Sequence, residues 1–234
     1  MKTLRILSGG AAQGLVENLA PIFEQRTGWR IDGEFGAVGT MAAKLRDGVP
    51  TDLVILTNPV IAALEHDGLI VPGSMTTIGL VETAIAIREG DPMVAIADAG
   101  QLRETLLASD ALFVPDMRSS TAGQHVARML DQLGISVQMK TRIQEFSNGA
   151  TAMREMSKST FNRSIGCTQS TEIIPTPKLI LVGALPPECA LSTVYSASIT
   201  WHSNDSAAAR MLIDLLTSLD HALIRTNAGF LKIE

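Results

Sequence analysis

The sequence predicts an α/β fold arranged as two lobes. Short apolar runs alternate with amphipathic segments, small-residue turns join them, and two long apolar stretches at 78–87 and 191–201 lack a helical period. Strand–helix alternation is typical of parallel sheets with helices on both faces. We therefore expect parallel or mixed sheets, and two crossings of the chain between the lobes, one at each long stretch.

Three strand–helix units are expected in the first 80 residues. The first helix ends at Thr27-Gly28, and its apolar face repeats at helical spacing through Leu15, Leu19, Ile22 and Phe23. In the third unit we expect Asn58 to cap a helix that has Pro59 at its first position. The expected elements are strands at 4–8, 29–35 and 51–56, and helices at 12–26, from about 40 to 46, and after Asn58.

The pattern repeats between the two long stretches. Strands are expected at 111–114, 143–146, 164–168 and 179–182, with helices at 121–133 and 150–158. A later helix at 204–219 is expected to begin at Asn204 and to bury Ala207, Met211, Leu212, Leu215 and Leu219, before a short helix near 221–225. Lobe 1 would then comprise 1–80 and 195–234, lobe 2 would comprise 81–194, and a ligand cleft would lie between them.

The composition excludes several classes of protein. Hydrophobic residues make up 46% and charged residues 18% of the 234 residues, which argues against disorder. A net charge of -5 argues against a nucleic-acid partner, and no apolar run is long enough for direct membrane insertion. Two cysteines and four scattered histidines provide no metal-spaced set, so we expect neither a metal nor a cofactor.

The first ten residues lack the complete pattern of a secretion signal. The chain as written is therefore expected to be cytoplasmic. It would be periplasmic if a preceding signal had been removed.

Several turns between strands and helices are candidate anion sites, because helix N-termini present free N–H groups. The turn at 8–14 does not fit a P-loop, since no Lys-Ser/Thr pair follows Gly14. A dinucleotide fingerprint would need glycine where Ala11 stands, although Asp32 is suitably spaced for it. A plain anion-binding turn and a ligand-free tight turn remain open as well. The candidate ligand residues of lobe 1 are Gly9, Gly10, Ala11, Val38, Gly39 and Thr40.

Lobe 2 contributes the other candidate turns. Arg118 could hold a carboxylate in two-point geometry, beside hydroxyls that can cap a helix or bind an anion. The candidates here are Arg118, Ser119, Ser120, Thr121, Asn148, Gly149, Ala150, Thr168 and Gln169. In open α/β sheets, ligands bind outside the carboxyl ends of the strands, where these turns are expected to lie.

With these turns, the chain resembles the type II periplasmic binding proteins, and more narrowly the molybdate-binding component of ABC transporters. The resemblance covers essentially the whole chain. Its most specific stretches are 4–23, 35–53, 116–123, 166–172 and 228–230. It implies two lobes, two crossings, a small anionic ligand held largely by hydroxyl and backbone donors, and membrane subunits of a transporter as partners if the protein is exported.

This chain departs from the molybdate-binding pattern at the ligand. The resemblance implies a serine in each of the first two turns and a tyrosine after a later strand, where this chain has Ala11, Val38-Gly39 and Gln169. The fold should therefore carry over with altered ligand specificity. The departures fit a similarity to aconitate isomerase, a related enzyme that moves a proton along an allylic tricarboxylate.

Two functions follow from these resemblances. The first is binding of a small oxyanion or carboxylate as a solute-binding protein. The alternative is a cytoplasmic isomerase of a polycarboxylate such as aconitate, which needs a proton-transfer group within hydrogen-bond reach. The candidate proton-transfer residues are His125, Glu172 and Asp116, with Cys167 as a weaker candidate, and His125 and Glu172 are taken as the catalytic pair. A nicotinamide-dependent oxidoreductase ranks third.

Overall fold

The computed structural model describes residues 2–233, and the chain divides into two compact units. Unit 1 comprises the chain up to Val81 and again from Thr193, while unit 2 is Glu82–Ser192. The chain passes from one unit to the other within β4 (Thr76–Arg88) and returns at the start of β9 (Ser192–Ile199). The two long apolar stretches of the sequence are therefore the two crossings.

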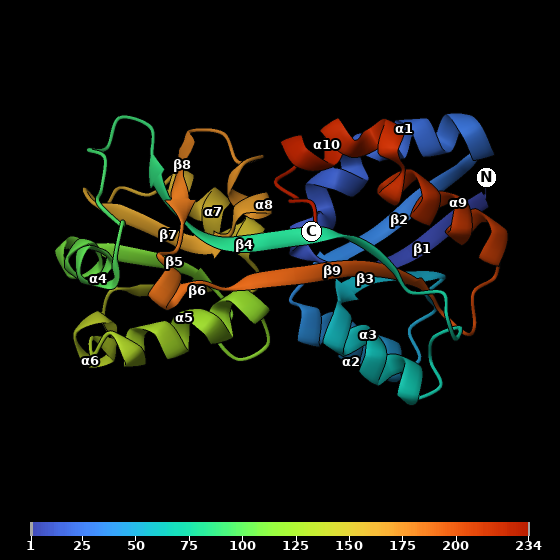
Figure 1. The fold of residues 1–234 in the computed structure, drawn as a ribbon, viewed down its shortest axis with the longest axis horizontal. Coiled ribbons are helices and arrows are strands. Elements are labelled where there is room, and N and C mark those ends of the chain that lie inside the picture. The colour runs from blue at the N-terminus through green and yellow to red at the C-terminus, as the bar shows by residue number, and fades with distance from the viewer. Residues whose placement is uncertain (1, 234) are drawn as a thin grey trace. The chain divides into compact units, whose positions relative to one another are not determined.

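Unit 1 contains a mixed sheet with the strand order β2-β1-β3-β9. Its strands β1 (Lys2–Gly9), β2 (Trp29–Gly36) and β3 (Leu53–Thr57) are parallel, and β9 runs antiparallel to β3. Figure 1 shows α1, α9 and α10 on one side of these strands and α2 and α3 on the other. The helices are η1 (Gly10–Ala12), α1 (Gln13–Thr27), α2 (Val38–Arg46), α3 (Asn58–His66), α9 (Ser206–Thr217), η3 (Leu219–His221) and α10 (Ala222–Asn227).

The apolar periodicity of the sequence explains the core of unit 1. Leu15, Leu19 and Phe23 of α1 are completely buried, and α1 ends at Gly28, whose φ of 71° is the left-handed conformation that favours glycine. All five residues of β3 are buried. A strand with both faces covered shows a continuous apolar run rather than alternation, as Leu53–Thr57 does.

Two helix starts in unit 1 differ from the prediction. Thr57 is the N-cap of α3, and Asn58 is its first residue, whose Oδ1 accepts a hydrogen bond from the Ser196 hydroxyl at 2.5 Å. In α9 the cap is Asp205, whose carboxylate accepts the Ala208 N–H at 2.9 Å. Both asparagines lie one residue from the true cap.

The predicted buried face of α9 is wrong in part. Leu212 and Leu215 are buried as expected. Ala207 is exposed, Met211 is 42% exposed, and Leu219 lies beyond the helix and is 87% exposed. The helix instead buries Ala208, Ala209, Leu212, Ile213, Leu215 and Leu216.

Unit 2 is built around three parallel strands, β5 (Ala111–Pro115), β6 (Ile143–Phe146) and β7 (Ser164–Gln169), with β5 in the middle. The part of β4 in this unit pairs antiparallel with β7 and with β8 (Leu179–Ala184). Figure 1 shows α7 and α8 on one side of these strands and α5 and α6 on the other. The helices are α4 (Ala99–Ala108), α5 (Thr121–Gln132), α6 (Ser136–Met139), α7 (Gly149–Ser157), α8 (Ser170–Ile173) and η2 (Pro187–Cys189).

Helix α4 was not predicted from the sequence. Asp98 caps it by accepting the Gln101 N–H at 2.8 Å, and Leu102 and Leu106 bury its inner face. Only these two apolar side chains repeat at helical spacing, which is too few to identify a helix by periodicity.

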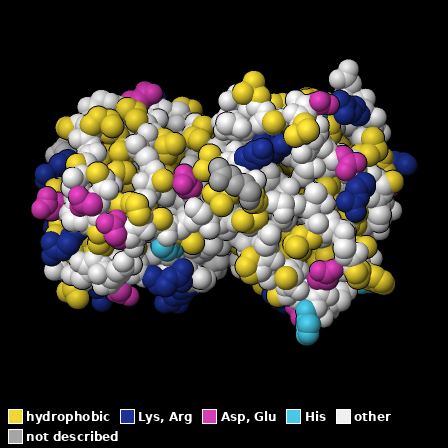
Figure 2. Space-filling view, in the orientation of Figure 1, with side chains coloured by type: hydrophobic (Ala, Val, Ile, Leu, Met, Phe, Trp, Pro, Cys, Tyr) yellow, Lys and Arg dark blue, Asp and Glu magenta, His cyan; other side chains and the backbone are white. Residues whose placement is uncertain are grey.

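Charges are interspersed on both units. Figure 2 shows basic and acidic side chains mixed over the visible face of each unit, with no broad surface of one sign. No helix in the described chain is long and apolar enough to span a membrane.

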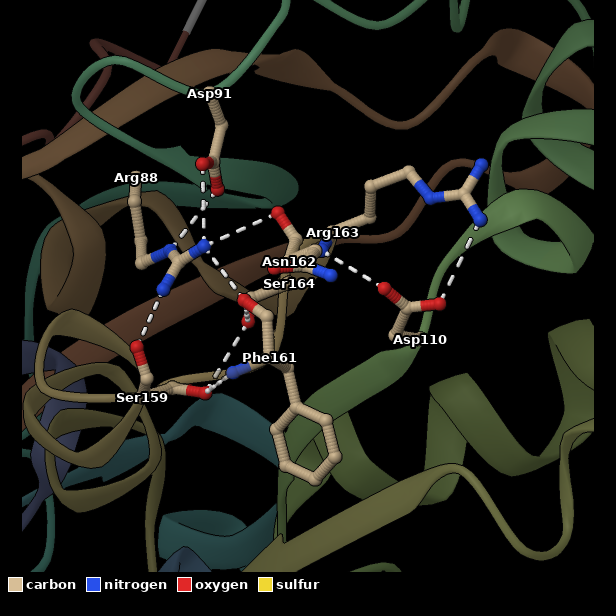
Figure 3. A network of polar contacts seen from close by, with 8 residues as sticks. All are labelled: Arg88, Asp91, Asp110, Ser159, Phe161, Asn162, Arg163 and Ser164. Atoms are coloured by element: carbon tan, nitrogen blue, oxygen red, sulfur yellow. Dashed lines mark hydrogen bonds and ion pairs between the residues drawn. The ribbon is translucent and has the colours of Figure 1, made fainter.

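An arginine network fixes one end of the unit 2 sheet (Figure 3). Arg88, the last residue of β4, donates from Nε and Nη2 to the two carboxylate oxygens of Asp91, at 2.9 and 3.1 Å. The same guanidinium donates to the backbone carbonyls of Ser159, Phe161 and Asn162, which precede β7. These bonds hold the loop at the amino end of β7 against the end of β4.

Candidate functional site

The carboxyl ends of the parallel strands bring most of the predicted residues of unit 2 to one edge. Pro115, Phe146 and Gln169 end strands β5, β6 and β7, and helices α5, α7 and α8 begin after them. Neighbouring strands lie about 4.8 Å apart, so the three turns are close together. This carboxyl edge of unit 2 is the candidate functional site.

The turn after β5 is held by Asp116. Its Oδ1 atom accepts three hydrogen bonds, from the Arg118 N–H at 2.9 Å, the Ser119 N–H at 2.6 Å and the Ser119 hydroxyl at 2.8 Å. Bonds from Ser119 hold the pKa of the Asp116 carboxyl below its usual range. Asp116 is therefore a poor base, and the Ser119 hydroxyl is already committed to it.

Arg118 lies at the tip of this turn. Its side chain is exposed, and its guanidinium takes part in no hydrogen bond or ion pair found within residues 2–233. The Arg118 carbonyl accepts a bond from the Gln124 side chain at 2.6 Å, which ties the turn to the first turn of α5. The backbone of this turn is therefore held in place, while the planar guanidinium of Arg118 is available to bind an anion.

The N-terminus of α5 is only partly capped. The Ser120 hydroxyl accepts the Gly123 N–H at 3.2 Å, and the Ser120 carbonyl accepts the Gln124 N–H at 2.9 Å. No hydrogen bond is found in the described chain for the N–H groups of Thr121 and Ala122. Two donors at the positive end of a helix dipole are therefore available to an acceptor.

The N-terminus of α7 is capped differently. Asn148 is the N-cap, and its Oδ1 accepts the Thr151 N–H at 2.8 Å. The N–H groups of Gly149 and Ala150 face the carboxyl group of Glu172 and act to lower its pKa. The donors that the sequence predicted for a ligand at 148–150 thus have partners within the chain.

Glu172 reaches α7 from α8 and is buried. Its Oε2 also accepts the Thr168 hydroxyl at 2.5 Å, and the backbone N–H of Gln169 donates to the same carboxyl group. Burial raises the pKa of Glu172, although these four donors act in the opposite direction. Thr168 and Gln169 are both buried, and the Thr168 hydroxyl is committed to Glu172.

Two further groups belong to this edge, the buried Thr171 and the partly buried His125. The Thr171 hydroxyl is buried and lacks a hydrogen-bond partner among the described residues, so α8 retains one unused donor. His125 of α5 bonds through Nε2 to the Cys189 carbonyl at 2.7 Å, a contact with η2 rather than with Glu172. The two predicted catalytic residues are therefore held by different elements.

Cys167 is part of the apolar core of unit 2. Burial raises the pKa of its thiol to about 12. A thiol with this pKa carries almost no thiolate at neutral pH, so Cys167 is unsuited to proton abstraction.

Unit 1 has its own carboxyl edge, at the ends of β1 and β2. Gly9 ends β1, and a Cβ atom at position 9 would lie 2.9 Å from the Tyr195 ring and 3.1 Å from Cγ2 of Val38. The first two predicted turns of unit 1 are thus in contact. Gly10 and Ala11 are buried, while Gly39 and Thr40 at the start of α2 are exposed.

Sequence reasoning missed Tyr195. It is buried on β9 opposite Thr57, the last residue of β3, and its ring packs edge-on against Phe230. It is the only tyrosine in the chain, but a single aromatic residue in a long apolar strand gives no sequence signal of its position beside Gly9.

A separate cavity of about 270 Å³ lies at the opposite, amino edge of the unit 2 sheet. Apolar side chains dominate its lining, including Ile87, Val94 and Ile165. The Thr105 and Ser109 hydroxyls beside it are bonded to backbone carbonyls. Arg163 also lines the cavity, and its guanidinium lies 3.6 Å from the Asp110 carboxylate. No cluster of three potential metal-ligating side chains occurs within residues 2–233.

Comparison with known proteins identifies the group to which this architecture belongs. Residues 4–231 match the family model described as bacterial extracellular solute-binding protein. The chain is 27% identical over 238 aligned positions to an aconitate isomerase from a Pseudomonas species, covering 97% of this chain and 87% of that protein.

Two solved structures show the same fold. The periplasmic molybdate-binding protein of Azotobacter vinelandii superimposes with a TM-score of 0.80 at 18% identity, covering 99% of this chain and 100% of that one. The sulfate-binding protein SubI of Mycobacterium tuberculosis gives 0.77 at 18% identity, covering 100% and 88%. The predicted type II periplasmic-binding-protein fold is confirmed.

Proposed function

Since the chain belongs to the bacterial extracellular solute-binding protein family, we propose that it binds a small polycarboxylate at the carboxyl edge of unit 2. The observation that carries this proposal is the pair of available N–H groups at Thr121 and Ala122, three and four residues beyond the available guanidinium of Arg118. Together they form a positively charged site whose hydrogen-bond donors can bind the oxygen atoms of an anion.

A carboxylate suits these groups better than a tetrahedral oxyanion. The planar fork of a guanidinium matches the two oxygens of a carboxylate. The available donors lie mainly in one turn, whereas a caged tetrahedral ion needs donors from several directions. The aconitate isomerase relative provides independent support, because its name denotes a tricarboxylate ligand.

Isothermal calorimetry at pH 7.5 tests the proposal. Citrate and cis- and trans-aconitate should bind, and R118A should bind each of them about tenfold to a hundredfold more weakly. The matched control is R163A, since Arg163 is also an exposed arginine of unit 2 but lies beside Asp110 at the amino edge. Equal weakening by both variants, or no binding of any carboxylate, would refute the proposal.

As a solute-binding protein, the chain would deliver this ligand to the membrane subunits of an ABC transporter. A second function, isomerisation of aconitate, is favoured by the 27% identical relative that spans 97% of the chain. The reaction removes a proton from the methylene carbon, shifts the double bond by one carbon, and returns a proton at the far end of the allylic system.

Glu172 is the better of the two candidate residues for this proton transfer. Burial raises its pKa, which is the direction that favours a carboxyl group able both to accept and to release a proton, and it lies at the candidate edge. Proton NMR of trans-aconitate in D₂O separates the two functions. An isomerase forms the cis isomer and incorporates deuterium, and E172Q abolishes both. A binding protein changes neither isomer.

A further inference from the structure

The first-turn donors of α7 all have partners inside the chain. The N–H groups of Gly149 and Ala150 face the Glu172 carboxyl group and act to lower its pKa, the Thr151 N–H donates to Asn148 Oδ1 at 2.8 Å, and the Ala152 N–H donates to the Asn148 carbonyl at 3.0 Å. In α5, by contrast, the first two N–H groups lack partners within the described chain. Two helices that begin at the same edge thus differ in what they can offer a ligand.

The arrangement at the N-terminus of α7 depends on Gly149 of α7 and on two residues from β7 and α8, Thr168 and Glu172. A Cβ atom at position 149 would lie 1.9 Å from Glu172 Oε2 and 2.1 Å from Thr168 Oγ1. Only glycine leaves room for both atoms. The Thr168 hydroxyl also donates to Glu172 Oε2, at 2.5 Å, and so fixes the carboxyl group in this place.

We infer that Glu172 is a specificity-determining residue, whose carboxyl group fills the acceptor position at the N-terminus of α7 and restricts unit 2 to a ligand carboxylate at the N-terminus of α5. We call the N-terminus of α7 the first position and the N-terminus of α5 the second. The inference for the first position rests on the contacts of Glu172, and the inference for the second rests on the proposed function. An oxyanion that requires both helix N-termini is excluded, because one of them already holds an internal carboxyl group.

Chemical rescue tests the first position without reference to the natural ligand. E172A removes a CH₂–COOH unit, and free acetate has the size and the acceptors to replace it. At 100 times its dissociation constant, acetate should raise the melting temperature of E172A by about 5–10 °C relative to an equal concentration of chloride. The wild type and E155A, which loses a half-exposed glutamate of α7, should show no such difference.

Amide hydrogen exchange followed by NMR tests both positions in the wild-type protein and does not depend on the folding of E172A. The Gly149 and Ala150 amides should be protected without ligand. The Thr121 and Ala122 amides should exchange rapidly and become protected when citrate is added.

The outcomes separate the two parts of the inference. Equal effects of acetate and chloride on E172A, or rapid exchange at Gly149, would overturn the role of Glu172. Rescue by acetate with no effect of citrate on Thr121 would leave Glu172 at α7 and overturn the polycarboxylate function instead.

Discussion

Gly149 and Glu172 are in direct contact across two helices of unit 2. The absence of a side chain at 149 allows Glu172 Oε2 to occupy a point only 1.9 Å from where a Cβ atom would stand. The carboxyl group thereby reaches the N–H groups of Gly149 and Ala150. This contact determines which helix N-terminus at the edge remains available to a ligand.

The contact predicts that G149A destabilises the fold. The new methyl group would overlap Glu172 and Thr168, and overpacking of this kind costs about 1–3 kcal/mol. Urea denaturation measures the loss. The matched control is G183A, since a Cβ there meets nothing closer than Ile96 Cδ1 at 3.7 Å and should change the stability by less than about 0.5 kcal/mol. Similar losses in both variants would show that the contact with Glu172 is not responsible.

The stability of the protein should depend on pH through Glu172. Burial raises its pKa in the folded state, so the folded chain holds this proton more tightly than the unfolded chain does. Its contribution to stability is fully present below the unfolded pKa of about 4.3 and is lost as the pH rises through the raised folded value.

E172Q removes this titration. The free energy of unfolding of the wild type relative to E172Q should therefore fall as the pH rises from acid toward neutral. Denaturation curves collected across that range measure it. A difference that stays constant, or that rises with pH, would show that the carboxyl group does not titrate as its burial requires.

Asp116 should affect ligand affinity more than stability. Its three hydrogen bonds order the turn that carries Arg118, while the residue itself is only half-buried. D116A should weaken citrate binding severalfold and leave the melting temperature nearly unchanged. Calorimetry and thermal unfolding of the same sample check this. A large drop in melting temperature with unchanged affinity would assign the turn a purely structural role.

The cysteines should be unreactive in the folded protein. Both thiols are buried, and burial raises the pKa of each, that of Cys167 to about 12. A thiol-specific disulfide reagent at pH 8 should label neither cysteine in the native state and both in urea. Rapid labelling of Cys167 in the native protein would contradict its place in the core.

Local patterns explain why much of the fold was predictable. Helix α1 has four apolar residues at helical spacing and a terminal glycine, and β3 is a short run covered on both faces. The caps of α3 and α9 were each misplaced by one residue, because adjacent side chains, Thr57 with Asn58 and Asn204 with Asp205, can all serve as caps.

The sequence predicted which turns contribute to the candidate site, but not the side-chain contacts between them. Sequence reasoning located the residues at the strand ends, since parallel topology places such turns at one edge. It could not show that Glu172 and Asp116 would take up the donors at Gly149 and Ser119, because those contacts depend on side-chain placement across different elements. The position of Tyr195 against Gly9 was hidden for the same reason.

Thermal unfolding against a panel of anions tests the central claim most directly. The panel contains citrate, cis- and trans-aconitate, molybdate, tungstate, sulfate and phosphate. The carboxylates should raise the melting temperature, by about 5–10 °C at 100 times the dissociation constant, and the tetrahedral ions should not. Stabilisation by molybdate or sulfate, with no effect of any carboxylate, would contradict the account.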